Sequence, residues 1–132
     1  MVKVLIIDDE EKLRNLLSKV LSFEGFEVFQ AANIKSGLKF LEAEEPEIII
    51  CDVKLPDGSG VDTAKLIKDK FPSVEVILLT AYGNIPDSVQ AIKNGAFDYI
   101  TKGDDNNKII PLLYKATEKV SLNRRIEQLQ KQ

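Results

Sequence analysis

The feature that most constrains the fold is a repeated alternation between short apolar runs and segments with helical periodicity. Each of five mainly apolar runs is followed by a stretch whose apolar residues recur at helical spacing. The expected strands cover residues 3–7, 26–31, 47–51, 74–79 and 96–100. The expected helices cover residues 11–23, 34–43, 61–71, 86–94 and a final stretch from about 107 towards the C-terminus.

This alternation predicts one α/β domain. Strands that are apolar throughout belong to a parallel sheet covered by helices on both faces. Right-handed crossovers and a length of 132 residues favour an open, doubly wound sheet over a closed eight-stranded barrel. The run at 26–31 alternates more than the others, so we expect it at an edge of the sheet. Gly25 and Gly95 are expected to end the first and fourth helices.

Composition removes several classes of function. The formal net charge is −3, which argues against direct nucleic-acid binding by this chain. There is no histidine, which excludes histidine-based acid–base catalysis and histidine–metal sites. The single cysteine, Cys51, cannot form an internal disulfide and is expected to be a buried apolar residue. No apolar run is long enough to span a membrane and no signal peptide is evident, so we expect a cytoplasmic protein.

Polar side chains follow four of the expected strands. Asp8 and Asp9 follow the first strand, Asp52 the third, Thr80 the fourth, and Lys102 lies just beyond the fifth. In an open parallel sheet the carboxyl ends of the strands share one edge, and ligands bind there. We therefore expect these five residues to meet if the first, third, fourth and fifth strands are neighbours.

Three carboxylates in one cleft repel one another unless a cation joins them. Oxygen ligands without histidine or cysteine suit a hard ion, Mg²⁺ before Ca²⁺. A carboxylate nucleophile, a lysine and a hydroxyl would complete what phosphoryl transfer requires. Asp8 and Asp9 taken alone could equally be a solvated strand end or a helix cap, whereas the position of Asp52 after a third apolar strand and before a proline- and glycine-containing loop favours a functional role. For Thr80 and Lys102 only the combined placement indicates this chemistry.

Four stretches of the chain together resemble the receiver domain of two-component response regulators: IIDDEEKLR, IIICDVKLPDGSG, VILLTAYG and NGAFDYITK. The resemblance covers residues 1 to about 120. It implies a five-stranded CheY-like sheet in the order 2-1-3-4-5. It also implies that a sensor histidine kinase is the partner and that the domain promotes its own phosphorylation and dephosphorylation without being a conventional enzyme.

The resemblance further assigns individual roles. Asp52 would be the phosphoacceptor, and Mg²⁺ would be held by Asp9, Asp52 and the main-chain carbonyl of Lys54, with Asp8 acting through a water. Thr80 and Lys102 would contact the phosphoryl group. The aromatic switch residue that moves with Thr80 would be Tyr99.

Two positions qualify the resemblance. Receiver domains usually carry proline after the lysine, but Gly103 stands there, so the usual cis peptide bond cannot form and the placement of Lys102 needs testing. Tyr82 is bulky and stands two residues beyond Thr80. We expect it to hinder the water that attacks the phosphoryl group and so to lengthen the lifetime of the phosphorylated state.

The last helix is longer than one domain requires. Leu122, Ile126 and Leu129 form a second apolar stripe, so we expect a receiver domain over 1–120 and a helical linker over 121–132. That linker would form a homodimer and lead to an output domain. The sequence NGAFDYITK followed by such a linker resembles the enhancer-binding, NtrC-like transcription activators.

Other functions remain open at this stage. An aspartyl phosphatase using Mg²⁺ would place its nucleophile after the first strand with a second acid two residues on, as in the pair Asp9 and Glu11. A flavin-binding protein of the same fold would need a phosphate-binding loop where the acidic run 8–10 stands. A binding scaffold that is never phosphorylated would not need the intact set of acids.

Overall fold

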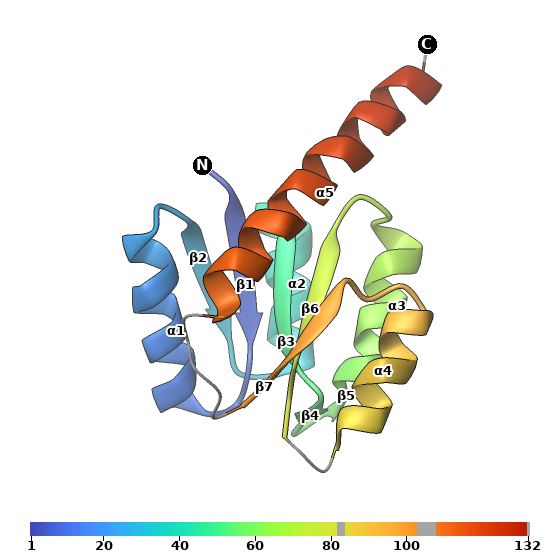
Figure 1. Cartoon of the computed structure of the whole chain (residues 1–132). Coiled ribbons are helices and arrows are strands. Elements are labelled where there is room, and N and C mark those ends of the chain that lie inside the picture. The colour runs from blue at the N-terminus through green and yellow to red at the C-terminus, as the bar shows by residue number, and fades with distance from the viewer. Residues whose placement is uncertain (82–83, 103–107, 132) are drawn as a thin grey trace.

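The computed structural model describes residues 1–81, 84–102 and 108–131, and its centre is a five-stranded parallel sheet with helices on both faces (Figure 1). The strands are β1 (Lys3–Ile7), β2 (Glu27–Ala31), β3 (Ile48–Asp52), β4 (Lys54–Leu55), β5 (Gly58–Ser59), β6 (Glu75–Thr80) and β7 (Asp98–Thr101). The helices are α1 (Glu11–Phe23), α2 (Ile34–Glu44), α3 (Gly60–Lys70), α4 (Ile85–Lys93) and α5 (Ile109–Gln130).

The strand order in the main sheet is β2-β1-β3-β6-β7, and all neighbouring strands are parallel. This confirms the predicted doubly wound sheet, because β6 and β7 are the fourth and fifth strands of the sequence prediction. It also confirms that β2 lies at an edge. The prediction did not include β4 and β5, which form a two-stranded antiparallel hairpin directly after β3.

Continuous apolar strands arise because both faces of the sheet are buried. In β1, Val4 and Ile6 pack into the cluster under α1 and α5, whereas Leu5 and Ile7 pack into the cluster under α2, α3 and α4. Successive side chains of a strand point to opposite faces, so each strand contributes to both clusters. The sheet is thereby held from both sides, and its carboxyl edge is fixed.

The predicted element ends differ from the observed ones by no more than two residues. The largest shift among the strands is in β7, which was expected to start at Ala96 but starts at Asp98. The backbone N–H of Ala96 donates to the carbonyl of Ala91 in the turn after α4, so it is not in the strand ladder. Gly25 and Gly95 follow their helices with φ of +100° and +114°, as expected for helix stops.

The last helix is continuous across the expected boundary at residue 120. It starts at Ile109. The expected start at Asn107 lies outside the described residues. Beyond Val120, Asn123 Nδ2 donates hydrogen bonds to Glu75 Oε2 (2.7 Å) and to the Ser73 carbonyl (3.4 Å). The helix is therefore held against the amino-terminal end of β6 before it projects beyond the sheet (Figure 1).

The projecting part of α5 exposes its apolar stripe. Leu122, Ile126 and Leu129 are all exposed. Within the described residues, no helix is both long enough and apolar enough to cross a membrane.

Candidate functional site

The sheet topology brings the four polar strand ends to one edge. Neighbouring strands align Ile7 with Cys51, Asp52 with Leu79, and Thr80 with Thr101. The residues that follow β1, β3, β6 and β7 are consequently adjacent in space although they are far apart in the sequence. This confirms the adjacency on which the sequence prediction depended.

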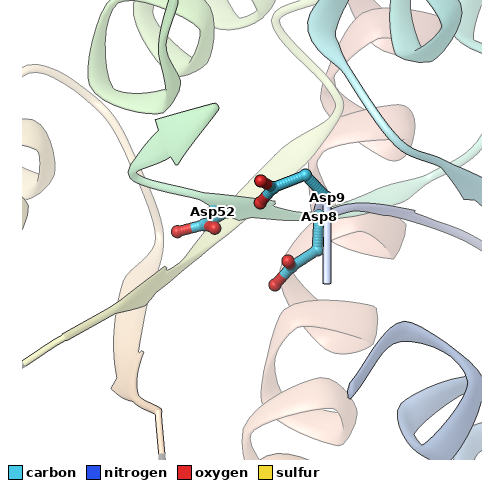
Figure 2. Close-up of side chains that lie close together, drawn as sticks. All are labelled: Asp8, Asp9 and Asp52. Atoms are coloured by element: carbon cyan, nitrogen blue, oxygen red, sulfur yellow. The ribbon is translucent and has the colours of Figure 1, made fainter. Parts of the chain in front are cut away.

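Three carboxylates gather at this edge and form the acidic triad of Asp8, Asp9 and Asp52 (Figure 2). One oxygen from each lies within 4.8 Å of the others. Asp8 is 0% exposed and Asp52 is 6% exposed, whereas Asp9 is open to solvent. Such a set of oxygen atoms matches the ligands that a hard divalent cation prefers.

Asp8 is held firmly on one side only. Its Oδ1 accepts a hydrogen bond of 2.8 Å from the backbone N–H of Glu10, but its buried Oδ2 accepts none from the described residues. Lys102 Nζ is 3.2 Å from Oδ2, in an ion pair outside hydrogen-bond geometry. Burial raises the pKa of Asp8, and the charge of Asp52 adds to that; the Glu10 N–H and Lys102 act in the opposite direction. A bound cation would satisfy this oxygen.

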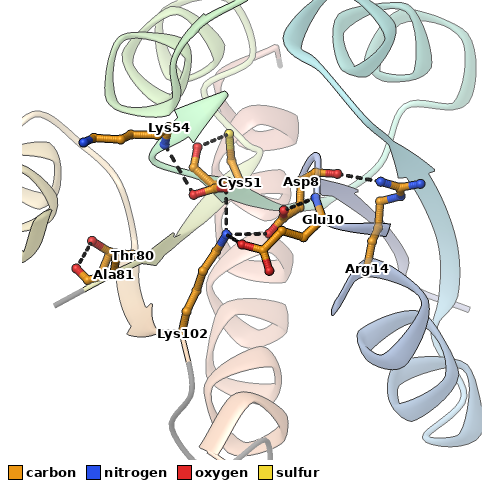
Figure 3. Close-up of polar contacts among 9 residues, drawn as sticks. Asp8, Glu10, Arg14, Cys51, Lys54, Thr80, Ala81 and Lys102 are labelled. Atoms are coloured by element: carbon orange, nitrogen blue, oxygen red, sulfur yellow. Dashed lines mark hydrogen bonds and ion pairs between the residues drawn. The ribbon is translucent and has the colours of Figure 1, made fainter. Parts of the chain in front are cut away.

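Lys102 reaches into the triad from the end of β7 (Figure 3). Its Nζ donates hydrogen bonds to Asp52 Oδ2 (2.8 Å) and Glu10 Oε1 (3.0 Å). Its backbone N–H donates to the Thr80 carbonyl at 2.7 Å. Burial alone would lower the pKa of Lys102, but the hydrogen bonds to Asp52 and Glu10 and the charges of Asp8 and Asp52 raise it above its usual range. Lys102 is therefore at the predicted position.

Asp52 is held by contacts to both of its oxygen atoms. Oδ2 is bound by Lys102, and Oδ1 accepts a hydrogen bond of 3.3 Å from the backbone N–H of Lys54, the first residue of β4. Cys51 precedes it and is fully buried. Burial raises the pKa of that thiol most, and the negative charges of Asp52 and Asp8 raise it further. The thiol therefore stays protonated and packs in the hydrophobic core. This confirms the expectation for Cys51.

Thr80 lies at the same edge, but its hydroxyl does not face Asp52. It donates a hydrogen bond of 3.0 Å to the carbonyl of Ala81, the next residue (Figure 3). Tyr99 is half-buried and packs against the core cluster under α2, α3 and α4. The expectations for Tyr82 and Gly103 fall outside the described residues.

Two features of the site were missed by the sequence prediction. Glu10 contacts Lys102, and its signal was the third acid in the run 8–10. Asp57, in the β4–β5 turn, accepts hydrogen bonds from the backbone N–H groups of Ile34 (2.9 Å) and Lys35 (3.0 Å) at the start of α2. These bonds lower the pKa of Asp57 and hold the β4–β5 hairpin against the start of α2.

Comparison with known proteins gives a consistent result. The response regulator receiver domain family matches residues 4–114. An NtrX-like response regulator of Rickettsia bellii is 39% identical over 128 residues, covering 94% of this chain and 26% of that protein. The response regulator protein PilR of Pseudomonas aeruginosa is 37% identical over 114 residues, covering 86% of this chain and 26% of that protein. This chain thus spans about a quarter of the length of these curated relatives.

Solved structures agree. NtrX from Brucella abortus in complex with ADP superimposes with a TM-score of 0.90 at 30% identity, covering 98% of this chain and 30% of that one. A response regulator receiver domain protein from Clostridium thermocellum gives a TM-score of 0.87 at 30% identity, covering 92% of this chain and 98% of that one. Domains of this family act as phosphoacceptors in two-component signalling and bind Mg²⁺ at an acidic pocket. The chain belongs to the response regulator receiver domain family and is related to the receivers of NtrC-like transcription activators.

Proposed function

We propose that Asp52 accepts a phosphoryl group from a phosphohistidine on a sensor histidine kinase. The observation that carries this assignment is that Asp8, Asp9 and the Lys102 ammonium all lie close to the Asp52 carboxylate. Lys102 Nζ is 2.8 Å from Asp52 Oδ2. Asp52 is also the triad member that ends a central strand of the sheet. Its carboxylate therefore has a fixed position and a cationic partner, which transfer by positioning and charge neutralisation requires.

The step forms one bond and breaks one. A carboxylate oxygen of Asp52 attacks the phosphorus atom of the donor, and the phosphorus–nitrogen bond to the imidazole breaks as the new oxygen–phosphorus bond forms. The bond electrons leave with the imidazole nitrogen, which takes a proton from solvent. Lys102 is close enough to neutralise charge on the phosphoryl oxygens as transfer proceeds.

The triad fits a magnesium ion. The buried Oδ2 of Asp8, which accepts no hydrogen bond from the described residues, and the clustered carboxylates are the observations that support the fit. Asp9, Asp52 and the main-chain carbonyl of Lys54 would hold the ion directly, with Asp8 bound through a water. Once bound, Mg²⁺ would neutralise charge on the phosphoryl oxygens and on the acids. Such a domain would promote its own phosphorylation and dephosphorylation without being a conventional enzyme.

Thr80 and Tyr99 would make up the switch. The Thr80 hydroxyl donates to the Ala81 carbonyl in this structure. It would have to leave that bond to contact a phosphoryl oxygen on Asp52. Phosphorylation adds a charge of about −1.5 to −2, which gives a reason for the rearrangement. Movement of Tyr99 from its half-buried position would carry the change to the surface of β7.

Residues 121–132 would connect the receiver domain over 1–120 to an output domain, by analogy a transcriptional one. The exposed stripe of Leu122, Ile126 and Leu129 would pair with a second copy of the chain as a short coiled coil. Sedimentation of the chain with and without residues 121–132 tests this. A lower mass on truncation is expected, and identical monomeric masses would count against the dimer.

Incubation with a small acyl phosphate and Mg²⁺, followed by intact-mass measurement, tests the function itself. We expect the chain to gain one phosphoryl group, and the gain to be lost in Asp52→Asn. The matched control is Asp57→Asn, which removes an acid five residues away that faces α2 and not the triad. If no donor modifies the chain, the proposed function is wrong.

A further inference from the structure

Glu10 lies beside the acidic triad without belonging to it. Its Oε1 is 3.0 Å from Lys102 Nζ, and its backbone N–H donates to Asp8 Oδ1 at 2.8 Å. The Glu10 side chain is 60% exposed, whereas that of Lys102 is 17% exposed. Glu10 therefore contacts Asp8 through its backbone N–H and Lys102 through its partly exposed carboxylate (Figure 3).

Any cation that enters the triad competes with Lys102 for its partners. The ammonium is paired with Asp8, Glu10 and Asp52, and two of these three acids are triad members. A divalent cation would draw on the charge of Asp8 and Asp52 and would also repel the nearby ammonium. Glu10 would then be the partner whose full charge remains available to Lys102.

Lys102 is restrained more at its backbone than at its ammonium. Its N–H donates to the Thr80 carbonyl, which holds the main chain at the end of β7. The lysine side chain is long and flexible. A side-chain partner outside the triad is therefore needed if Lys102 is to stay close to Asp52 after a cation binds.

We propose that Glu10 is a positioning residue that keeps the Lys102 ammonium beside Asp52 while a divalent cation occupies the acidic triad. This rests on the proposed function, because it concerns phosphoryl transfer to Asp52. Glu10 acts through Lys102 and does not itself contact the transferred group. The pair is partly exposed, and pairs of this kind change an equilibrium by about two- to fivefold. The phosphorylation rate should change by a similar factor.

The first test compares Glu10→Gln with Glu11→Gln. Both variants lose one negative charge from adjacent residues, but of these two glutamates only Glu10 is recorded in an ion pair with Lys102 among the described residues. The rate of phosphorylation by a small acyl phosphate at saturating Mg²⁺ is followed by intact mass. We expect Glu10→Gln to be about two- to fivefold slower than Glu11→Gln. Equal rates would overturn the proposal.

A second measurement separates positioning from metal binding and from folding. Titration with Mg²⁺ should show that Glu10→Gln and Glu11→Gln weaken the affinity for Mg²⁺ to the same extent. The two variants should also have the same thermal midpoint of unfolding. In a Lys102→Met background, Glu10→Gln should have no further effect on the phosphorylation rate. An undiminished effect in that background would overturn the proposal, because Glu10 would then act without Lys102. Absence of any modification in the unaltered chain would instead overturn the proposed function, and this inference with it.

Discussion

Among the described glycines, Gly60 is the one at which a single methyl group should disturb Asp52, the proposed acceptor, most. It is the first residue of α3 and its backbone N–H donates to the Val53 carbonyl at 2.7 Å. A Cβ built at Gly60 would overlap the main-chain carbonyl oxygen of Asp52, and would lie 2.8 Å from the carbonyl carbon and 3.0 Å from Val53 Cα. These are backbone atoms of the acceptor segment, which cannot rotate away as a side chain can.

Two opposing effects set the size of the change. Replacing glycine by alanine normally stabilises a protein by about 0.4–1 kcal/mol, because the unfolded chain loses freedom. Overpacking in a rigid environment costs about 1–3 kcal/mol and can cost more when the backbone must shift. We therefore expect Gly60→Ala to lower the free energy of unfolding by about 2 kcal/mol and to displace the Asp52 carboxylate.

Gly37 in α2 is the matched control. A Cβ there would meet Cδ1 and Cγ1 of the buried Ile7 side chain and no backbone atom of residues 52–53, so Gly37→Ala should cost about 1–3 kcal/mol without displacing the Asp52 carboxylate. Urea unfolding measures both free energies, and intact mass after treatment with an acyl phosphate measures acceptor function. Phosphorylation should slow in Gly60→Ala and not in Gly37→Ala. If Gly60→Ala matches the unaltered chain in both stability and rate, the close approach of α3 to Asp52 is wrong.

Three further predictions follow from other contacts. Asn123→Ala should lower the free energy of unfolding by about 1–3 kcal/mol, because it leaves the almost fully buried Glu75 with fewer hydrogen-bond donors. Arg124→Ala, which removes an exposed ion pair, should change that free energy little. Equal effects of the two substitutions in urea unfolding would contradict this. Asp57→Asn should lower stability at neutral pH. The folded pKa of Asp57 is below the ordinary 3.8, so the difference from the unaltered chain should persist above pH 3.8 and disappear as the pH falls through the folded pKa; a pH-independent difference in urea midpoints would refute it. Asp8→Asn should raise the thermal midpoint of unfolding without Mg²⁺, because it removes a desolvated charge. It should also abolish most of the rise in thermal midpoint that Mg²⁺ causes. If Mg²⁺ raises the midpoint of the variant as much as that of the unaltered chain, Asp8 is not part of the metal site.

The main sheet and the members of the site could be predicted from the sequence because both depend on the backbone pattern. Runs such as 3–7 and 47–51 are buried on two faces, so their composition alone identifies central parallel strands. The strand order then places Asp8, Asp52 and Lys102 at one edge whatever their side chains do. Position along the chain was therefore enough to select these residues.

Contacts between side chains could not be predicted in the same way. The ion pair between Glu10 and Lys102 joins residues 92 positions apart, and depends on the rotamers of two long side chains. The Thr80 hydroxyl is oriented towards the Ala81 carbonyl by its side-chain rotamer, which the periodicity of the sequence does not predict. Each strand of the β4–β5 hairpin is only two residues long, which is too short to give a strand pattern. Asp57 holds this hairpin against α2 by accepting hydrogen bonds from backbone N–H groups of that helix.

The central claim is that Asp52 and no other acid of the triad carries the phosphoryl group. Treatment with an acyl phosphate and Mg²⁺, reduction with borohydride and peptide mass mapping would locate it, because reduction converts an aspartyl phosphate into homoserine. We predict homoserine at position 52, with Asp8 and Asp9 unchanged. Homoserine at Asp8 or Asp9 with Asp52 intact would contradict the account.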